Sequence, residues 1–126
     1  FRNEAGGLEL RKHFFKGCIP PKDISLKRNG SDGFAVFEGF MDYLSAMQLG
    51  IIASDWLVLN SVSNVEKAVK VLHGYERIEC YLDNDEAGRR TFQRLHDCLR
   101  EKVIDRSSLY ADHKDLNDYL LSQRQV

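Results

Sequence analysis

Two stretches decide the fold expected for this chain: FAVFEGFMDYLSA at residues 34–46 and ECYLDNDEAGRRT at residues 79–91. Each begins as a short apolar run typical of a buried strand, ends on carboxylates, and continues into a helical pattern. The carboxylates are Glu38 and Asp42 in the first stretch and Asp83 and Asp85 in the second, and those at the strand ends are Glu38, Asp83 and Asp85. If the strands are parallel neighbours in one sheet, these groups meet at its carboxyl edge. Because clustered carboxylates repel one another, such a group indicates a divalent cation and chemistry on phosphates.

Around these stretches, strand-like and helix-like segments alternate along the chain. Ser63 and Glu66 have the spacing of a capping box. The alternation predicts an α/β fold, with a mainly parallel sheet of about four strands flanked by helices. Strands are expected at 33–38, 56–62, 77–83 and within 103–112, and helices at 40–49, 63–72, 86–102 and 115–122.

The N-terminal part of the chain differs from the rest in charge. Residues 1–28 carry seven basic and three acidic side chains, a net charge of +4, so the remainder of this chain of net charge −1 carries −5. Segment 8–15 can form a strand or hairpin arm, and the turn-rich loop 29–33 ends this region. We therefore expect a basic arm at 1–32 and a catalytic core at 33–126. A basic arm beside an acidic half suits a bound polyanion, although a solvated Lys/Arg surface explains the charge equally well.

Composition limits the class of protein. A chain of 126 residues with 43% hydrophobic and 29% charged side chains is typical of one soluble globular domain. No apolar run approaches the roughly 18 residues that a membrane span needs, and no secretory segment opens the chain. The three cysteines lack zinc-type spacing, so no zinc site is expected within this chain, and we interpret Cys80 and Cys98 as reduced thiols of a cytoplasmic protein. Because the chain opens on Phe1 and not on Met, we expect it to be a fragment of a longer protein.

The acidic residues leave two interpretations open. Asp83 and Asp85 can hold one Mg²⁺ or bridge two, or Asp85 can simply cap the following helix. Glu38 closes an apolar strand, which stability does not explain, and its useful roles are metal ligand or general acid/base. Asp42 lies one helical turn further on. It can support the same site, or be a first-turn acidic residue favoured by the helix dipole.

The end of the last expected strand adds a further acidic group. Asp115 is a natural N-cap for the final helix, which we rank first, and it also fits a second metal at the same edge. Lys114 can contact phosphate. Arg89, at the start of the long helix, can contact nucleic acid or be solvated, and neither interpretation is favoured. A calcium loop is rejected, because Arg94 stands where that loop needs a bidentate Glu.

These motifs resemble those of the Toprim domain, which primases, topoisomerases and OLD-family nucleases share. The pattern of that family is a hydrophobic strand ending in Glu-Gly, then a second strand ending in Asp-x-Asp with a nearby Gly. Here the two motifs are VFEG at 36–39 and YLDNDEAG at 81–88, in the same order and strand context. The resemblance covers about residues 33–121 and implies the Rossmann-like Toprim fold.

Within this family the chain is most similar to the primase branch, because EGFMDYLSA, LDNDEAGRRT and KDLNDYL resemble elements that recur there. The resemblance implies metal-dependent nucleotidyl transfer, in which an RNA primer is made from NTPs on a single-stranded DNA template. Asp83 and Asp85 would hold Mg²⁺ or Mn²⁺. Glu38 would be a ligand or the general acid/base, with Asp42 and Asp115 in support.

The N-terminal part also resembles the basic arm of primases and of primase-like proteins from mobile elements. By this resemblance Arg11, Lys16 and Lys22 are candidates for contact with template or nucleotide. LNSVSN and PPKDIS depart from cellular replicative primases, which favours a plasmid, phage or conjugative-element protein. A zinc-binding module and a helicase are the partners to look for elsewhere in the parent chain. Without them we expect the isolated fragment to be weakly active or inactive.

Two other functions stay open. A Toprim nuclease uses the same carboxylates to admit water in place of a 3′-hydroxyl. A Toprim module can also serve DNA binding or assembly without catalysis, although an intact acidic set argues against this. A topoisomerase is less favoured, because nothing in the sequence indicates a strand-gate module.

Overall fold

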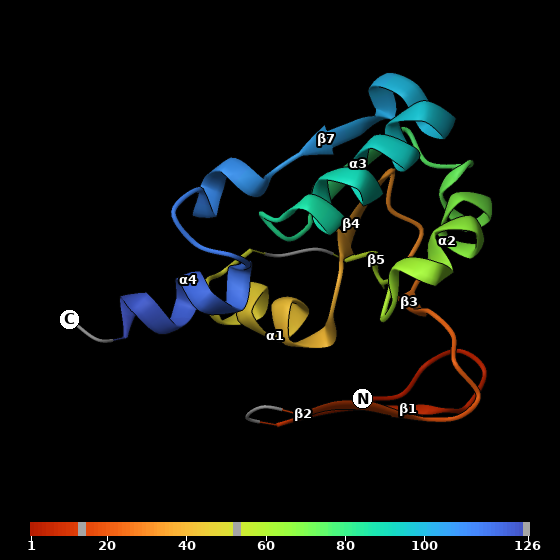
Figure 1. The fold of residues 1–126 in the computed structure, drawn as a ribbon. Coiled ribbons are helices and arrows are strands. Elements are labelled where there is room, and N and C mark those ends of the chain that lie inside the picture. The colour runs from red at the N-terminus through yellow and green to blue at the C-terminus, as the bar shows by residue number, and fades with distance from the viewer. Residues whose placement is uncertain (13–14, 52–53, 125–126) are drawn as a thin grey trace.

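The structure is a computed structural model that describes residues 1–12, 15–51 and 54–124. Its strands are β1 (Leu8–Lys12), β2 (Phe15–Ile19), β3 (Ser25–Lys27), β4 (Gly33–Phe37), β5 (Trp56–Val58), β6 (Arg77–Tyr81) and β7 (Val103–Asp105). Its α-helices are α1 (Phe40–Gln48), α2 (Val65–Leu72), α3 (Glu86–Leu99) and α4 (Leu116–Gln123). Short 3₁₀ turns occupy Val62–Asn64, Arg100–Lys102 and Ser107–Tyr110. Strands and helices alternate from β4 onward, as the sequence predicts (Figure 1).

The central sheet has the strand order β3-β5-β4-β6-β7. The pairs β4–β5, β4–β6 and β6–β7 are parallel, and β3 pairs with β5 in the antiparallel direction. The α/β prediction is confirmed, but the sheet has five strands where about four were expected. The additional strand, Ser25–Lys27, comes from the segment assigned to the arm. An edge strand of only three residues leaves too short a pattern to be recognised from sequence.

Helices cover both faces of this sheet, because successive side chains of a strand point to opposite faces. Phe34 and Val36 of β4 pack into a core with the buried sides of α2 and α3. The alternate residues Ala35 and Phe37 pack into a second core with α1 and α4. The result is a three-layer α/β/α arrangement, with β4 in the middle of the sheet (Figure 1).

Strands β1 and β2 form a separate antiparallel hairpin, which lies away from the central sheet in Figure 1. Arg11 pairs with Lys16, and Lys12 pairs with Phe15. Neighbouring residues in a strand point to opposite sides, so Arg11 and Lys12 face different directions. Arg11 and Lys16 share one side and both line the cleft described below, whereas Lys12 is not among the described residues lining it.

Several expected element boundaries were wrong for local reasons. β5 ends at Val58, because Asn60 takes a left-handed conformation with φ 66°. The predicted capping box of Ser63 and Glu66 is not formed. Ser61 accepts from the N–H of Ser63 to begin a 3₁₀ turn, and Asn64 precedes α2 without a capping side chain. α3 ends at Leu99 rather than 102, because the next residue has φ 59°.

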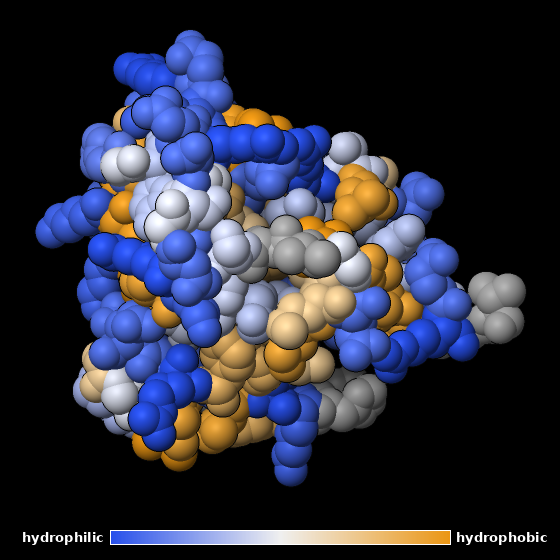
Figure 2. Space-filling view, turned by 180° about the vertical axis from the view of Figure 1, so that it is seen from behind, coloured by the Kyte–Doolittle hydropathy of each residue, from blue (hydrophilic) through white to orange (hydrophobic). Residues whose placement is uncertain are grey.

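Figure 2 shows the molecule from behind. Most of this face is hydrophilic, and hydrophobic side chains are exposed on it in patches. The exposed large hydrophobic residues include Leu44 and Met47 of α1 and Leu121 of α4. Within the described residues, no helix combines the length and the apolar character required to cross a membrane.

Candidate metal centre

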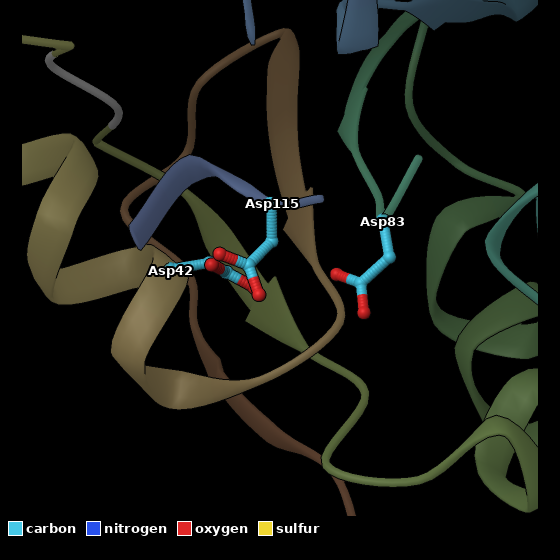
Figure 3. A group of neighbouring side chains, drawn as sticks. All are labelled: Asp42, Asp83 and Asp115. Atoms are coloured by element: carbon cyan, nitrogen blue, oxygen red, sulfur yellow. The ribbon is translucent and has the colours of Figure 1, made fainter. Parts of the chain in front are cut away.

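Three aspartates meet at the carboxyl edge of the sheet (Figure 3). Asp42 lies in the first turn of α1, Asp83 follows β6, and Asp115 immediately precedes α4. One carboxylate oxygen from each lies within 4.8 Å of the others. Phe37 of β4 pairs with Tyr81 of β6, and this register brings the residues after both strands to the same edge.

The electrostatics of this group are unfavourable for three negative charges. Burial raises the pKa of Asp42 to about 7, and the nearby charges of Asp115 and Glu38 add to the effect. Burial likewise raises the pKa of Asp83 to about 8, with Glu38 and Asp42 contributing. At neutral pH the group therefore requires either protons or a cation. Three carboxylates are the hard oxygen donors that Mg²⁺ and Mn²⁺ prefer, so the residues fit a divalent cation.

Glu38 lies directly after β4 and beside the three aspartates, but outside the group that meets within 4.8 Å. Its Oε1 accepts a hydrogen bond from the backbone N–H of Asp83 at 3.5 Å. Its charge is also one cause of the raised pKa of Asp83. Glu38 can therefore act on a bound ligand as a separate carboxylate.

Asp85 has a different role from Asp83 in the structure. It is the N-cap of α3, and its Oδ1 accepts from the N–H of Gly88 at 2.7 Å. Among the described residues it does not join the three-carboxylate group. Of the two interpretations that the sequence left open for Asp85, the structure favours helix capping.

Gly88 is required by the same turn. A Cβ built on it would lie 2.0 Å from the carbonyl oxygen of Asp83. The first turn of α3 therefore packs directly against the backbone of Asp83. This contact fixes the position of the backbone from which the Asp83 side chain extends.

Asp115 caps a helix and also lies in the acidic group. Its Oδ1 accepts from the N–H of Asp118 at 2.8 Å, which caps α4, and it also belongs to the acidic group. The first turn of α4 is held against α1, since the N–H of Asn117 donates to Oδ1 of Asp42 at 3.1 Å. Ser45 adds a hydrogen bond to Oδ1 of Asn117 at 3.0 Å. Sequence reasoning did not identify Asn117, which carries no motif signal.

A cleft of about 210 Å³ joins the acidic group to the basic hairpin. Arg11 and Lys16 line it from the hairpin, and Lys114 lines it from the segment before α4. Lys22 and Arg89, which were also candidates, are not among the described residues that line this cleft. Its acidic lining residues are Glu9, Glu38, Asp42, Asp83 and Asp115.

Asn60 also lines the cleft and was not identified from sequence. Its Nδ2 donates to the backbone oxygen of Asp23 and to Oγ of Ser25, both at 3.0 Å. Its Oδ1 is the one buried side-chain nitrogen or oxygen, within the part of the chain that the structure describes, that has no hydrogen-bond partner. Its left-handed backbone is typical of Asn but not visible in a hydrophobicity pattern.

Fold and site together define an α/β domain with an acidic centre at its sheet edge. The family model for Toprim-like domains matches residues 35–120. The chain therefore belongs to the Toprim-like family, and the resemblance stated from its motifs is confirmed. No curated protein has significant similarity to the chain.

Two solved structures relate the fold to a primase. The primase fragment of the bacteriophage T7 primase-helicase protein aligns with a TM-score of 0.75 at 23% identity, over 98% of this chain and 56% of that one. A structure of the bacteriophage T7 lagging-strand DNA polymerase, interacting with primase domains bound to an RNA/DNA hybrid and dTTP, also matches. It aligns with a TM-score of 0.60 at 26% identity, over 73% of this chain and 48% of that one. This chain thus spans about half the length of each matched chain.

Proposed function

We propose that this chain is the Toprim catalytic domain of a primase-like protein and supports metal-dependent nucleotidyl transfer. In this reaction a 3′-hydroxyl attacks the α-phosphate of an NTP on a single-stranded DNA template, the bond between the α- and β-phosphates breaks, and pyrophosphate leaves. The observation that carries the proposal is one cleft with two kinds of lining: a group of three aspartates and the basic side chains of the hairpin. The likeness in fold to the T7 primase fragment supports it.

The chain's own residues would divide the work. Asp42, Asp83 and Asp115 would hold Mg²⁺ or Mn²⁺, which neutralises charge that develops on the phosphates. Arg11 and Lys16 would attract the triphosphate or the template backbone from the opposite wall of the cleft.

Glu38 and Lys114 would act on the reacting groups. Glu38 stands outside the group of three aspartates and would take the proton of the attacking hydroxyl. Lys114 precedes Asp115 and would contact phosphate beside the acidic centre. Asp85 keeps a secondary place in the proposal, because it caps α3.

The proposal extends to the parent protein. It keeps a basic N-terminal part at 1–32 and a catalytic core at 33–126, with Ser25–Lys27 of the N-terminal part adding an edge strand to the sheet of the core. A zinc-binding module and a helicase are proposed elsewhere in the parent chain. We place that protein in the cytoplasm of a bacterial host, in a plasmid or phage context.

Primer synthesis by the parent protein tests the reaction. With single-stranded templates, labelled NTPs and Mg²⁺ or Mn²⁺, we expect short RNA products from the wild type and none from Asp83→Asn or Glu38→Gln. Glu101→Gln, which changes an exposed acidic residue outside the cleft, is the matched control and should retain synthesis.

The same reactions separate primase from its alternatives. Metal-dependent cleavage of the template in place of RNA synthesis would assign a nuclease. Template binding with neither product, unchanged in the Asp83 variant, would assign a non-catalytic module. Normal primer synthesis by Glu38→Gln would refute the role given to that residue.

A further inference from the structure

The acidic centre depends on a segment with little regular structure. Asp83 follows β6, whereas Asp115 lies at the far end of a connection that runs from β7 through the 3₁₀ turn Ser107–Tyr110. The next residues, 111–115, belong to no helix or strand. The position of Asp115 relative to Asp83 must therefore come from tertiary contacts.

Asn84, the residue between Asp83 and Asp85, makes most of these contacts. Its backbone N–H donates to the carbonyl oxygen of Lys114, the neighbour of Asp115. Its side-chain Nδ2 lies 3.2 Å from the carbonyl oxygen of Ser107, 3.0 Å from that of Tyr110 and 3.1 Å from that of His113. The side-chain amide of Asn84 thus contacts both the 3₁₀ turn and the segment before α4.

A second contact supports the same connection. The hydroxyl of Tyr110 donates to the carbonyl oxygen of Leu82 at 2.7 Å. Tyr110 is 1% exposed and packs in the core shared with Leu116. The turn is therefore anchored by packing at Tyr110, the stretch just before Asp115 is anchored by Asn84, and the helix that follows is held by the hydrogen bond from Asn117 to Asp42.

The charges of the centre act against this arrangement. Asp42, Asp83 and Asp115 repel one another when ionised, and Asp115 ends a segment, 111–115, that belongs to no helix or strand. Hydrogen bonds that hold this segment to residue 84 oppose the separation of the carboxylates. Groups that hydrogen-bond to metal ligands typically change metal affinity by about 10–100-fold when removed, and for a group that holds the segment before a ligand we take the lower end of this range.

We propose that Asn84 is a positioning residue that sets the cation affinity of the centre by holding Asp115 beside Asp83. The inference rests on the proposed function, because it assumes that the three aspartates bind a divalent cation. It assigns a role to the middle residue of the DND motif, which the metal-binding interpretation of Asp-x-Asp leaves undefined.

Mn²⁺ titration by calorimetry, on the chain of 126 residues, tests the inference. For Asn84→Ala we expect affinity to fall about 10-fold or more. Asn84→Asp keeps the size of the side chain but replaces the donor with an acceptor that faces three carbonyl oxygens, so we expect at least the same loss. Asn64→Ala is the matched control. It removes another amide donor, bonded to the carbonyl oxygen of Leu59 at 2.9 Å, and within the described part of the chain neither residue lines the cleft.

Stability and exchange measurements separate positioning from general destabilisation. In EDTA, the melting temperatures of the Asn84 and Asn64 variants should both fall, but only the Asn84 variants should bind Mn²⁺ more weakly. Hydrogen exchange without metal should become faster at 107–115 in Asn84→Ala and stay unchanged in β4.

Two results would overturn the inference. One is wild-type Mn²⁺ affinity in Asn84→Ala, and the other is an equal loss of affinity in Asn64→Ala. Absence of Mn²⁺ binding by the wild type would instead refute the proposed metal centre. In that case, an unchanged rate of hydrogen exchange at 107–115 in Asn84→Ala would also show that Asn84 does not hold this segment.

Discussion

Asp83 and Asp85 are two positions apart, yet the structure gives them different partners. Asp83 joins the acidic group, whereas the carboxylate of Asp85 is engaged by the N–H of Gly88. From the sequence alone, Asp85 could be either a metal ligand beside Asp83 or the cap of the following helix. A DxD spacing does not reveal which carboxylate caps the following helix, because that depends on the conformation of the loop between strand and helix.

Substitution of each aspartate by asparagine separates these roles. We expect Asp83→Asn to reduce Mn²⁺ affinity strongly, since it removes a charged ligand. Asp85→Asn should reduce it less, because Asn caps helices about as well as Asp. Asp85→Ala should cost about 1 kcal/mol of unfolding free energy, because it removes the cap. Calorimetric titration and chemical denaturation measure the two effects, and equal loss of affinity in both Asn variants would return Asp85 to the ligand set.

Gly88→Ala tests the close contact between α3 and the backbone of Asp83. The added Cβ would lie 2.0 Å from a backbone oxygen, so the strand end or the helix must move. We expect destabilisation of about 1–3 kcal/mol, typical of overpacking, together with weaker Mn²⁺ binding. Gly74→Ala is the control, because its Cβ would meet nothing within 4 Å. Wild-type stability and affinity in Gly88→Ala would contradict the contact.

At the scale of elements, the sequence predicted where helices and strands lie more reliably than where each of them ends. α1 and α4 match the expected segments to within a residue, and Asp115 caps α4 as expected. The predicted ends of β5 and α3 were wrong because Asn60 and Arg100, which follow these elements, have a positive φ that ends the regular backbone conformation. Hydrophobic periodicity reports which residues share a face, but it does not report a single change in backbone conformation.

The hairpin β1–β2 brings two basic side chains, Arg11 and Lys16, to the cleft. We expect a double variant, Arg11→Ala with Lys16→Ala, to weaken binding of single-stranded DNA and to reduce its salt dependence, by a slope of about 0.7 for each phosphate that is no longer neutralised. Lys12→Ala is the matched control, because Lys12 is adjacent but points to the other side of the hairpin. Fluorescence anisotropy over a series of salt concentrations measures both quantities. An equal effect of Lys12→Ala would show that general charge, not the cleft, attracts DNA.

At the scale of the whole molecule, the buried carboxylates link stability to pH. In the folded state the pKa of Asp42 is about 7 and that of Asp83 about 8, both above the ordinary 3.8. The folded protein therefore holds protons that the unfolded chain has already released, and its stability declines as pH rises from the ordinary pKa through these raised values.

We expect the melting temperature of the metal-free protein to fall between about pH 5 and pH 8.5. The double variant Asp42→Asn with Asp83→Asn should show a smaller decline. Saturating Mn²⁺ should restore stability most at the upper end of this range, because there the cation no longer competes with protons. Differential scanning fluorimetry in EDTA and in Mn²⁺ measures both, and an identical pH profile for wild type and double variant would contradict the raised pKa values.

The sequence by itself determined the alternation of strands and helices and the two acidic motifs. These features are local: side-chain periodicity and the residues that close a strand are visible within a few positions. Only the tertiary structure decided that Asp42, Asp83 and Asp115 meet, that Asp85 caps a helix, and that Arg11 and Lys16 face the same cleft. Distances between residues far apart in the chain depend on strand order, register and loop anchoring, as at Asn84, and a pattern along one sequence does not contain them.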